Sequence, residues 1–263
     1  MSRQNYYAMR RYRQERAVDE DLIVRLVRCE RQQQPRIGGR KLLHMLGGTM
    51  AEHGVVVGRD RLFEVLRNHG LLVERKLGRV RTTNSRHSLP VFHNLVAGKV
   101  PTAPNQTWVS DLTSIRTEEG FLFGAVIMDL FSRKIVGSHI GDSLEAAGCL
   151  AALNEALGQL PANRSPIHHS DRGCQYCCHE YVGRLQERGL PISMTEVMHC
   201  YENAAAERVI GTLKQEYELD RTFRTKEQAL AAFRQAVWLY NCRRPHLALG
   251  YATPVQVHVR AAA

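Results

Sequence analysis

Hydrophobic positions in the first quarter of the chain recur at helical spacing and predict three helices separated by glycine turns. The first apolar face begins near Asp19 and is ended by Pro35 and the Gly38-Gly39 pair. The third helix, roughly Arg59 to Asn68, is closed by Gly70. The apolar positions of the three helices are Leu22, Ile23, Leu26 and Val27; Leu42, Leu43 and Leu46; and Leu62, Phe63, Val65 and Leu66.

From about Trp108 the pattern changes to strands and longer helices. The second strand is nearly all apolar, which predicts a central position in a sheet. The expected strands are 107–115, Phe121–Leu130, Lys134–Ile140, a short strand ending at Asp171, and Pro191–Met194. The expected helices are 143–158, His179–Arg188, one that follows Asn203, and Lys226–Tyr240. This order predicts an α/β domain with a mixed five-stranded sheet and flanking helices.

The helix after Asn203 carries charged residues beside an apolar stripe. Asn203 is a plausible N-cap, and an alanine-rich turn follows it. Glu207 and Lys214 are seven residues apart, so they lie nearly above one another at the border of the stripe. A carboxylate at this border can face a cleft while its helix stays packed. The stripe consists of Ala206, Ile210, Leu213 and Tyr217.

Basic charge is concentrated in the first part of the chain. The net charge is +10, but residues 1–100 hold 20 Lys and Arg against 9 Asp and Glu, whereas residues 101–263 hold 16 against 17. A basic module of short helices with tight turns is typical of a helix-turn-helix unit, which could place its last helix in a DNA groove. The alternative is a small bundle whose arginines are only solvated. The candidate DNA-binding residues here are Arg40, Lys41, Arg59, Arg61 and Arg67.

Two flanking segments add to this basic region. Residues 1–20 are polar and basic, and we expect a helix extension or a mobile arm there. Residues 74–106 lack a clear period and predict an irregular linker that could follow a phosphate backbone, with Arg79 and Arg81 as candidate contacts.

Three acidic residues stand in a recognisable order. Asp111 lies in a β-prone run, Asp171 ends a short strand, and thirty-five residues separate Asp171 from Glu207. This arrangement, with Lys214 seven residues further on, resembles the DDE transposases and retroviral integrases. Flanking motifs resemble more narrowly the OrfB transposases of the IS-three group of bacterial insertion sequences. These motifs are His169-Ser170-Asp171-Arg172-Gly173-Cys174-Gln175-Tyr176, Asn203-Ala204-Ala205-Ala206-Glu207, Thr82-Thr83-Asn84-Ser85-Arg86-His87-Ser88 and Tyr240-Asn241-Cys242-Arg243-Arg244-Pro245-His246.

The resemblance implies a fold and a chemistry. It implies a ribonuclease-H-like catalytic core in which Asp111, Asp171 and Glu207 converge. It also implies that the protein nicks DNA at the ends of its insertion sequence and joins the freed 3′ hydroxyl to a target strand. Two Mg²⁺ ions, for which Mn²⁺ could substitute, would be held by the three carboxylates, because Mg²⁺ prefers oxygen ligands. Lys214 would position a DNA phosphate.

The resemblance also implies partners and a location. Double-stranded DNA is expected as both element end and target, bound by a homo-oligomer. An upstream OrfA product is expected, usually as a frameshift fusion. Seven cysteines without a regular pattern do not predict a disulfide framework, and no apolar run reaches the ~20 residues of a membrane span. We therefore expect a cytoplasmic, nucleoid-associated bacterial protein.

Four segments are predicted along the chain. Residues 1–73 form the helix-turn-helix-like region and residues 74–106 the linker. Residues 107–225 form the catalytic core, and residues 226–263 form a C-terminal helix and basic tail that pack on it as a brace.

Alternative interpretations remain at this stage. The chain could be a non-catalytic DNA-binding regulator of transposition, or a nuclease that cuts without joining. Asp129, inside an apolar run, is the rival acid, and we expect it to be structural and paired with Arg133 or Lys134. A single CxxC is weak evidence for zinc, and Cys174 stands where the family commonly has Ser. The possible zinc ligands are Cys174, Cys177, Cys178 and His179. His168 and His169 could assist proton transfer, although a packed role is expected.

Overall fold

A boundary near residue 76 divides the chain into two units, Met1–Lys76 and Leu77–Ala263. The computed structural model describes residues 3–73, 89–196 and 203–261. Within the stretch expected to be a linker, residues 89–106 contain no helix or strand. They are attached to the second unit, because the amide of Leu95 donates to Ser193 Oγ at 2.8 Å.

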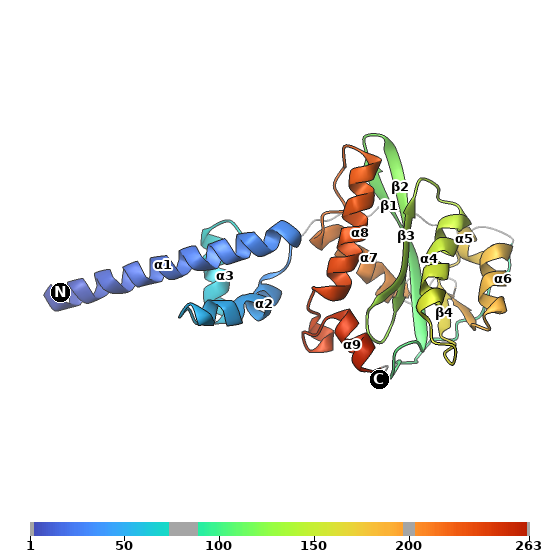
Figure 1. Ribbon diagram of the computed structural model, residues 1–263, viewed down its shortest axis with the longest axis horizontal. Coiled ribbons are helices and arrows are strands. Elements are labelled where there is room, and N and C mark those ends of the chain that lie inside the picture. Colours follow the sequence, from blue (N-terminus) through green and yellow to red (C-terminus); the bar gives the residue numbers. More distant parts are fainter. Residues whose placement is uncertain (1–2, 74–88, 197–202, 262–263) are drawn as a thin grey trace. The chain divides into compact units, whose positions relative to one another are not determined.

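The first unit is a bundle of three helices. They are α1 (Arg3–Gln33), α2 (Gly39–Glu52) and α3 (Arg59–Asn68), and α1 continues past the other two toward the N-terminus (Figure 1). The helix extension expected for residues 1–20 is thus present from Arg3 onward. The bundle encloses a small apolar core of Ile23, Val24, Val27, Ile37, Leu42, Leu46, Met50, Val55, Leu62, Val65 and Leu66.

The second unit is built on a five-stranded mixed sheet. Its order is β3-β2-β1-β4-β5; β2 pairs antiparallel with β1 and β3, whereas β4 pairs parallel with β1 and β5. The apolar strand β2 is interior as predicted, but the middle strand is β1. The strands are β1 (Thr107–Thr117), β2 (Gly120–Asp129), β3 (Ile135–Gly141), β4 (Ile167–Ser170) and β5 (Ile192–Met194).

Helices cover both faces of this sheet (Figure 1). One face carries α4 (Ala146–Gln159), α5 (Cys174–Cys177) and α6 (His179–Glu187); the other carries α7 (Ala204–Glu216) and α8 (Lys226–Cys242). Because side chains alternate along a strand, Trp108 and Leu112 of β1 face the first layer, and Val109 and Ile115 face the second. The α/β prediction of a mixed sheet with flanking helices is confirmed.

Two short helices were not predicted. Helix α5 has a single turn, which is too short to produce a periodic pattern. Helix α9 (Pro254–Arg260) has a capping box between Thr253 and Gln256 with Pro at its first turn, a signal that the sequence does contain. A 3₁₀ turn (Leu247–Leu249) precedes α9.

The C-terminal motif serves as a brace. Asn241 hydrogen-bonds both backbone groups of Ile135, at 2.8 and 2.9 Å, which ties α8 to the edge strand β3. The buried guanidinium of Arg244 pairs with both carboxylate oxygens of Glu216, at 2.8 and 2.9 Å. The tail thereby holds the C-terminal end of α7, and these contacts agree with the predicted brace.

Close packing of β3 on α4 leads to the first prediction. A Cβ added at Gly137 would lie 2.1 Å from the carbonyl oxygen of Ala152 and 2.9 Å from Ala156 Cβ. Gly137→Ala should therefore lower the free energy of unfolding by about 1–3 kcal/mol in urea denaturation. Gly183→Ala, in open space on α6, is the matched control and should stabilise by about 0.5–1 kcal/mol. An unchanged midpoint for Gly137→Ala would mean that α4 does not pack on β3 as described.

Candidate active site

Strand pairing brings the first two acids together. The parallel register of β1 with β4 matches Trp108 with His168 and Val109 with His169, an offset of sixty residues. Continued by two residues, this register places Asp111 of β1 beside Asp171, which directly follows β4. Asp111 lies on the same face of β1 as Val109 and Ile115, which is the face that α7 covers.

The helix α7 brings the third acid to the same face. Its buried residues Ala206, Val209 and Leu213 belong to the apolar core on this face of the sheet. Asn203 occupies the N-cap position but does not cap the helix with its side chain. Instead its side-chain amide donates to the carbonyl oxygen of Ser110 at 3.0 Å. This bond holds the first turn of α7, which carries Glu207, against the residue that precedes Asp111.

The pKa of Asp111 is shifted by burial and by other charged side chains nearby. Burial, followed by the negative charges of Asp171 and Glu207, raises the pKa of Asp111 to about 7. Lys214 opposes this shift, as does the hydrogen bond from the Leu112 amide at 2.8 Å. Burial also lowers the pKa of Lys214, although the Asp111 carboxylate opposes that shift. The other three charged side chains predicted for the site, Asp171, Glu207 and Lys214, therefore lie within electrostatic reach of Asp111.

This donor set fits a hard divalent cation. Asp171 Oδ1 accepts a hydrogen bond from the Gly173 amide at 3.0 Å, which holds the carboxylate in the loop after β4. Carboxylate oxygens are the ligands that Mg²⁺ prefers, and a cation relieves the repulsion that raises the Asp111 pKa. Across the described residues, no three His, Cys, Asp or Glu side chains stand close enough to form a closed metal site.

Asp129 has a separate, structural environment. It pairs across the sheet with Trp108, so it belongs to the opposite face from Asp111. Its buried carboxylate accepts hydrogen bonds from the Asn105 amide at 2.8 Å and from Ser132 Oγ at 2.6 Å. These bonds, together with His258, hold its pKa below the ordinary value despite burial. The structural interpretation agrees with this geometry, but the carboxylate accepts its hydrogen bonds from Asn105 and Ser132, with His258 Nδ1 3.8 Å away, rather than from Arg133 or Lys134.

The histidines before Asp171 are packed inside the unit. His168 Nε2 lies 2.9 Å from the Tyr181 hydroxyl, and burial lowers its pKa to about 3, so the ring is neutral. His169 Nδ1 lies 2.8 Å from Ser193 Oγ. Both rings are fully buried, and neither contact is with one of the three acids. The packed interpretation is the one that this geometry favours.

The candidate DNA-binding residues of the first unit differ in their exposure and in the ion pairs that they form. Arg61 pairs with Glu20 of α1 and with Glu64, so its guanidinium also holds α3 against α1. Arg67 on α3 is exposed, and Arg59 pairs with its exposed neighbour Asp60.

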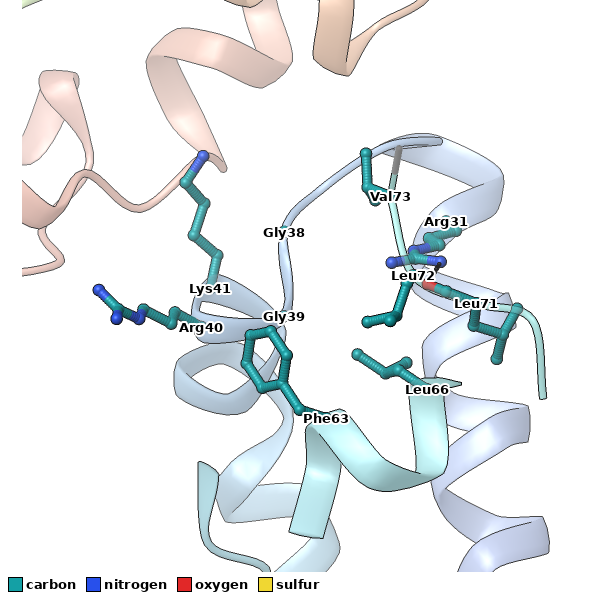
Figure 2. Close-up of a pocket in the computed structure, with 10 residues that line it drawn as sticks. All are labelled: Arg31, Gly38, Gly39, Arg40, Lys41, Phe63, Leu66, Leu71, Leu72 and Val73. Carbon is teal, nitrogen blue, oxygen red and sulfur yellow. Dashed lines mark hydrogen bonds between the residues drawn. The ribbon is translucent and has the colours of Figure 1, made fainter. Parts of the chain in front are cut away.

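An open pocket of about 420 Å³ lies in the same unit. Figure 2 shows Arg40 and Lys41 directed away from Phe63, Leu66 and Leu72, whose side chains face the hollow. The two cations therefore sit at the edge of an apolar pocket and reach outward. Arg79 and Arg81 lie outside the described residues.

Comparison with known proteins identifies the family. Integrase core domain models match residues 101–200 and 188–254. The chain is 39% identical over 207 residues to the insertion element IS600 uncharacterized 31 kDa protein of Shigella sonnei, covering 78% of this chain and 76% of that protein. It is 34% identical over 193 residues to the transposase InsF for insertion sequence IS3A of Escherichia coli K12, covering 73% and 67% respectively.

A solved structure supports the fold. The chain resembles the simian T-cell lymphotropic virus intasome in complex with PP2A regulatory subunit B56 gamma, with a TM-score of 0.52 and 19% identity, over 81% of this chain and 70% of that one. The second unit is thus an integrase-type, ribonuclease-H-like core. The chain belongs to the IS3 family of insertion-sequence DDE transposases, which confirms the predicted family and function class. Within the described ranges no helix has the length and apolarity needed to cross a bilayer.

The raised pKa of Asp111 predicts a pH-dependent stability. Between its ordinary value of 3.8 and about 7, the folded state keeps a proton that the unfolded state releases, so stability falls as pH rises through this window. Asp111→Asn keeps an oxygen that accepts from Leu112 but removes the charge. The variant should therefore melt at a higher temperature than wild type above pH 7, and the difference should shrink near pH 4. Mg²⁺ should raise the melting temperature of wild type above pH 7 and leave the variant unchanged.

Glu180→Gln, an exposed acid on α6, is the matched control and should follow the wild-type curve. A wild-type curve that coincides with that of Asp111→Asn at every pH would mean that Asp111 is not under the charge stress described.

Proposed function

We propose that Asp111, Asp171 and Glu207 form the catalytic centre of this transposase, where they hold two Mg²⁺ ions. The centre cleaves DNA strands at the insertion-sequence ends and joins the freed 3′ hydroxyl to target DNA. The observation that carries this proposal is the parallel register of β1 with β4, which, continued by two residues, brings Asp111 beside Asp171 on the face of the sheet that α7, the helix of Glu207, covers. Mn²⁺ should substitute for Mg²⁺, since both take carboxylate oxygens in octahedral sites.

The protein's own groups have distinct tasks in this chemistry. Bound Mg²⁺ would supply activation of the attacking oxygen and stabilisation of the leaving oxygen. Asp111 and Asp171 would share metals and Glu207 would complete the second site, while Asp171 is held by Gly173 and Glu207 by the anchored start of α7. The ammonium group of Lys214 would bind a DNA phosphate next to these carboxylates. The Asn203 and Arg244 contacts keep α7 at a set position, so that Glu207 and Lys214 would face the same substrate.

The first unit would bind DNA by a helix-turn-helix-like arrangement with α3 as the groove-facing helix. Support comes from the basic balance of residues 1–100 and from the outward Arg40, Lys41 and Arg67. Arg59 would also bind DNA, by releasing Asp60 and pairing with a phosphate. Arg79 and Arg81, in the linker, would contact the DNA phosphate backbone between the DNA-binding region and the catalytic core. The proposed division is residues 1–73 for DNA binding, 74–106 for the linker, 107–225 for catalysis and 226–263 for the brace.

We further propose the assembly in which this chemistry takes place. A homo-oligomer on DNA would bring two element ends together. An OrfA product, joined as a frameshift fusion, would add end recognition. Because the substrate is bacterial chromosomal DNA, the protein would act in the cytoplasm at the nucleoid.

The catalytic assignment predicts loss of both reactions in three variants. Asp111→Asn, Asp171→Asn and Glu207→Gln should each reduce nicking and joining of labelled element-end DNA with Mg²⁺ by roughly 100-fold or more, because each removes a charge that the metal-assisted step needs. DNA binding should persist in all three. Glu180→Gln should retain activity. Variants that cut as well as wild type would refute the triad, and a wild type that binds but never cuts, even when fused to OrfA, would favour a non-catalytic regulator.

Arg67 is exposed on α3, whereas Arg61 forms ion pairs, so we expect substitutions of the two to have different effects. Arg67→Ala should weaken binding to all DNA sequences about equally and reduce the slope of log affinity against log salt by about 1. Arg61→Ala should instead lower the unfolding temperature of the first unit, because it breaks the pairs with Glu20 and Glu64. Binding titrations at several salt concentrations, with thermal melts alongside, separate the two effects. An Arg67→Ala variant with unchanged affinity would argue against α3 as the DNA-facing helix.

A further inference from the structure

The strands β4 and β5 end together beside the proposed catalytic centre. The amide of His168 donates to the Pro191 carbonyl at 2.8 Å, and the amide of Thr195 donates to the Ser170 carbonyl at 3.0 Å. Both bonds follow the parallel pairing of the two strands. Asp171 is the first residue after the last pair, so it lies where the chain leaves the sheet and turns toward α5.

A side chain supplies the next bond in this series. Hydrogen bonds along one edge of a parallel strand recur every two residues, so the amide that follows those of residues 168 and 170 belongs to residue 172. Its acceptor in a continued ladder is the carbonyl of Thr195, four residues beyond Pro191. In the structure this carbonyl accepts from the side chain of the same residue, Arg172 Nε, at 2.6 Å. The Arg172 guanidinium therefore joins the two strands at the point where their backbone ladder stops.

This substitution of a side chain for an amide frees the backbone after β4 to turn. Because Arg172 reaches Thr195 with its guanidinium, the peptide groups of residues 171–173 can leave the direction of the strand. The Gly173 amide then donates back to Asp171 Oδ1 at 3.0 Å. The Arg172 side chain is half-buried, which partly shields its contact from water. The Asp171 carboxylate is thus held in a turn whose two following residues are both fixed.

We propose that Arg172 is a positioning residue that keeps the Asp171 carboxylate in place for metal binding. Without the guanidinium, Asp171 would lie beyond the end of a ladder whose final backbone bond among the described residues is the one to Ser170. The turn could then move away from β5, and the carboxylate would move with it. Removing a group that orients a ligating carboxylate typically lowers metal affinity by about 10–100-fold. The metal-binding consequence rests on the proposed function of Asp171, whereas the effect on the turn does not.

The effect on the turn is tested by hydrogen exchange of the full chain, followed by NMR at the Gly173 amide. Arg172→Ala should speed this exchange roughly fivefold or more, because the carboxylate that accepts from the amide is less well held. Arg172→Lys keeps a donor on a long side chain and should restore part of the protection. Unchanged Gly173 exchange in Arg172→Ala would overturn the proposal.

Arg184→Ala is the matched control for this measurement. Arg184 Nε also makes a side-chain hydrogen bond, to Asn154 Oδ1 at 2.8 Å, but it joins α6 to α4. Its loss should leave Gly173 exchange as it is in wild type. Equal acceleration by Arg184→Ala and Arg172→Ala would mean general loosening of the unit and would also overturn the proposal.

The consequence for metal binding is tested by titrating the joining reaction with Mg²⁺. Arg172→Ala should raise the Mg²⁺ concentration for half-maximal joining about tenfold or more, and excess Mg²⁺ should recover most of the rate. Arg172→Lys should lie between this variant and wild type. Affinity for element-end DNA should match that of wild type in both variants.

The other roles open to Arg172 give different results. Direct contact with DNA would weaken DNA binding, and a purely structural role would lower the melting temperature and the maximal rate without moving the Mg²⁺ midpoint; either result would overturn the positioning role. Failure of the proposed catalytic function would instead appear as absent joining by the wild type at every Mg²⁺ concentration. The Gly173 exchange would then still decide whether Arg172 holds Asp171.

Discussion

The parallel pairing of β1 with β4 is the interaction on which the site depends. The pairing brings together segments sixty residues apart, so that the end of β4 delivers Asp171 beside Asp111. A shift of this register by one residue would turn the Asp111 side chain to the opposite face of the sheet. That face is covered by α4 and α6, and α7 does not reach it. Trp108 and Leu112 oppose such a slip, because their burial in the first layer fixes which residues of β1 face α7.

The negative charges of the three acids repel one another, and the packing and hydrogen bonds of the fold oppose this repulsion. Burial first, and then the charges of Asp171 and Glu207, raise the pKa of Asp111 to about 7. Helix α7 is held at its start by the Asn203 bond to β1 and at its end by the bidentate Arg244–Glu216 pair, with its apolar stripe buried between these points. In the proposed mechanism, residues 240–246 would contribute by holding α7 in position rather than by contacting substrate. The buried cores on both faces of the sheet keep the elements that carry these acids in place, and under the proposed function a bound cation would offset their repulsion.

Much of the fold and of the candidate site followed from the sequence, because both depend on strong local patterns. The apolar run of β2 and the stripe of α7 identified their elements, and the spacing of the three acids identified the family. Other features could not be predicted, since they depend on distant contacts. Asn203 is a residue type that commonly caps helices, but its side chain donates to the Ser110 carbonyl instead. The Asp129 carboxylate is stabilised by groups as remote in sequence as Asn105 and His258. Helix α5 is too short to leave a pattern.

Metal-directed cleavage of the polypeptide is the measurement that tests the central claim most directly. Fe²⁺ takes the place of Mg²⁺ in oxygen-rich sites, and with ascorbate and peroxide it generates radicals that cut the backbone beside the bound ion. Convergence of the three acids predicts cuts near residues 111, 171 and 207 together. All three should be suppressed by excess Mg²⁺ and lost in Asp111→Asn. Cuts near only one of these positions, or a pattern unchanged by Asp111→Asn, would contradict a shared metal site.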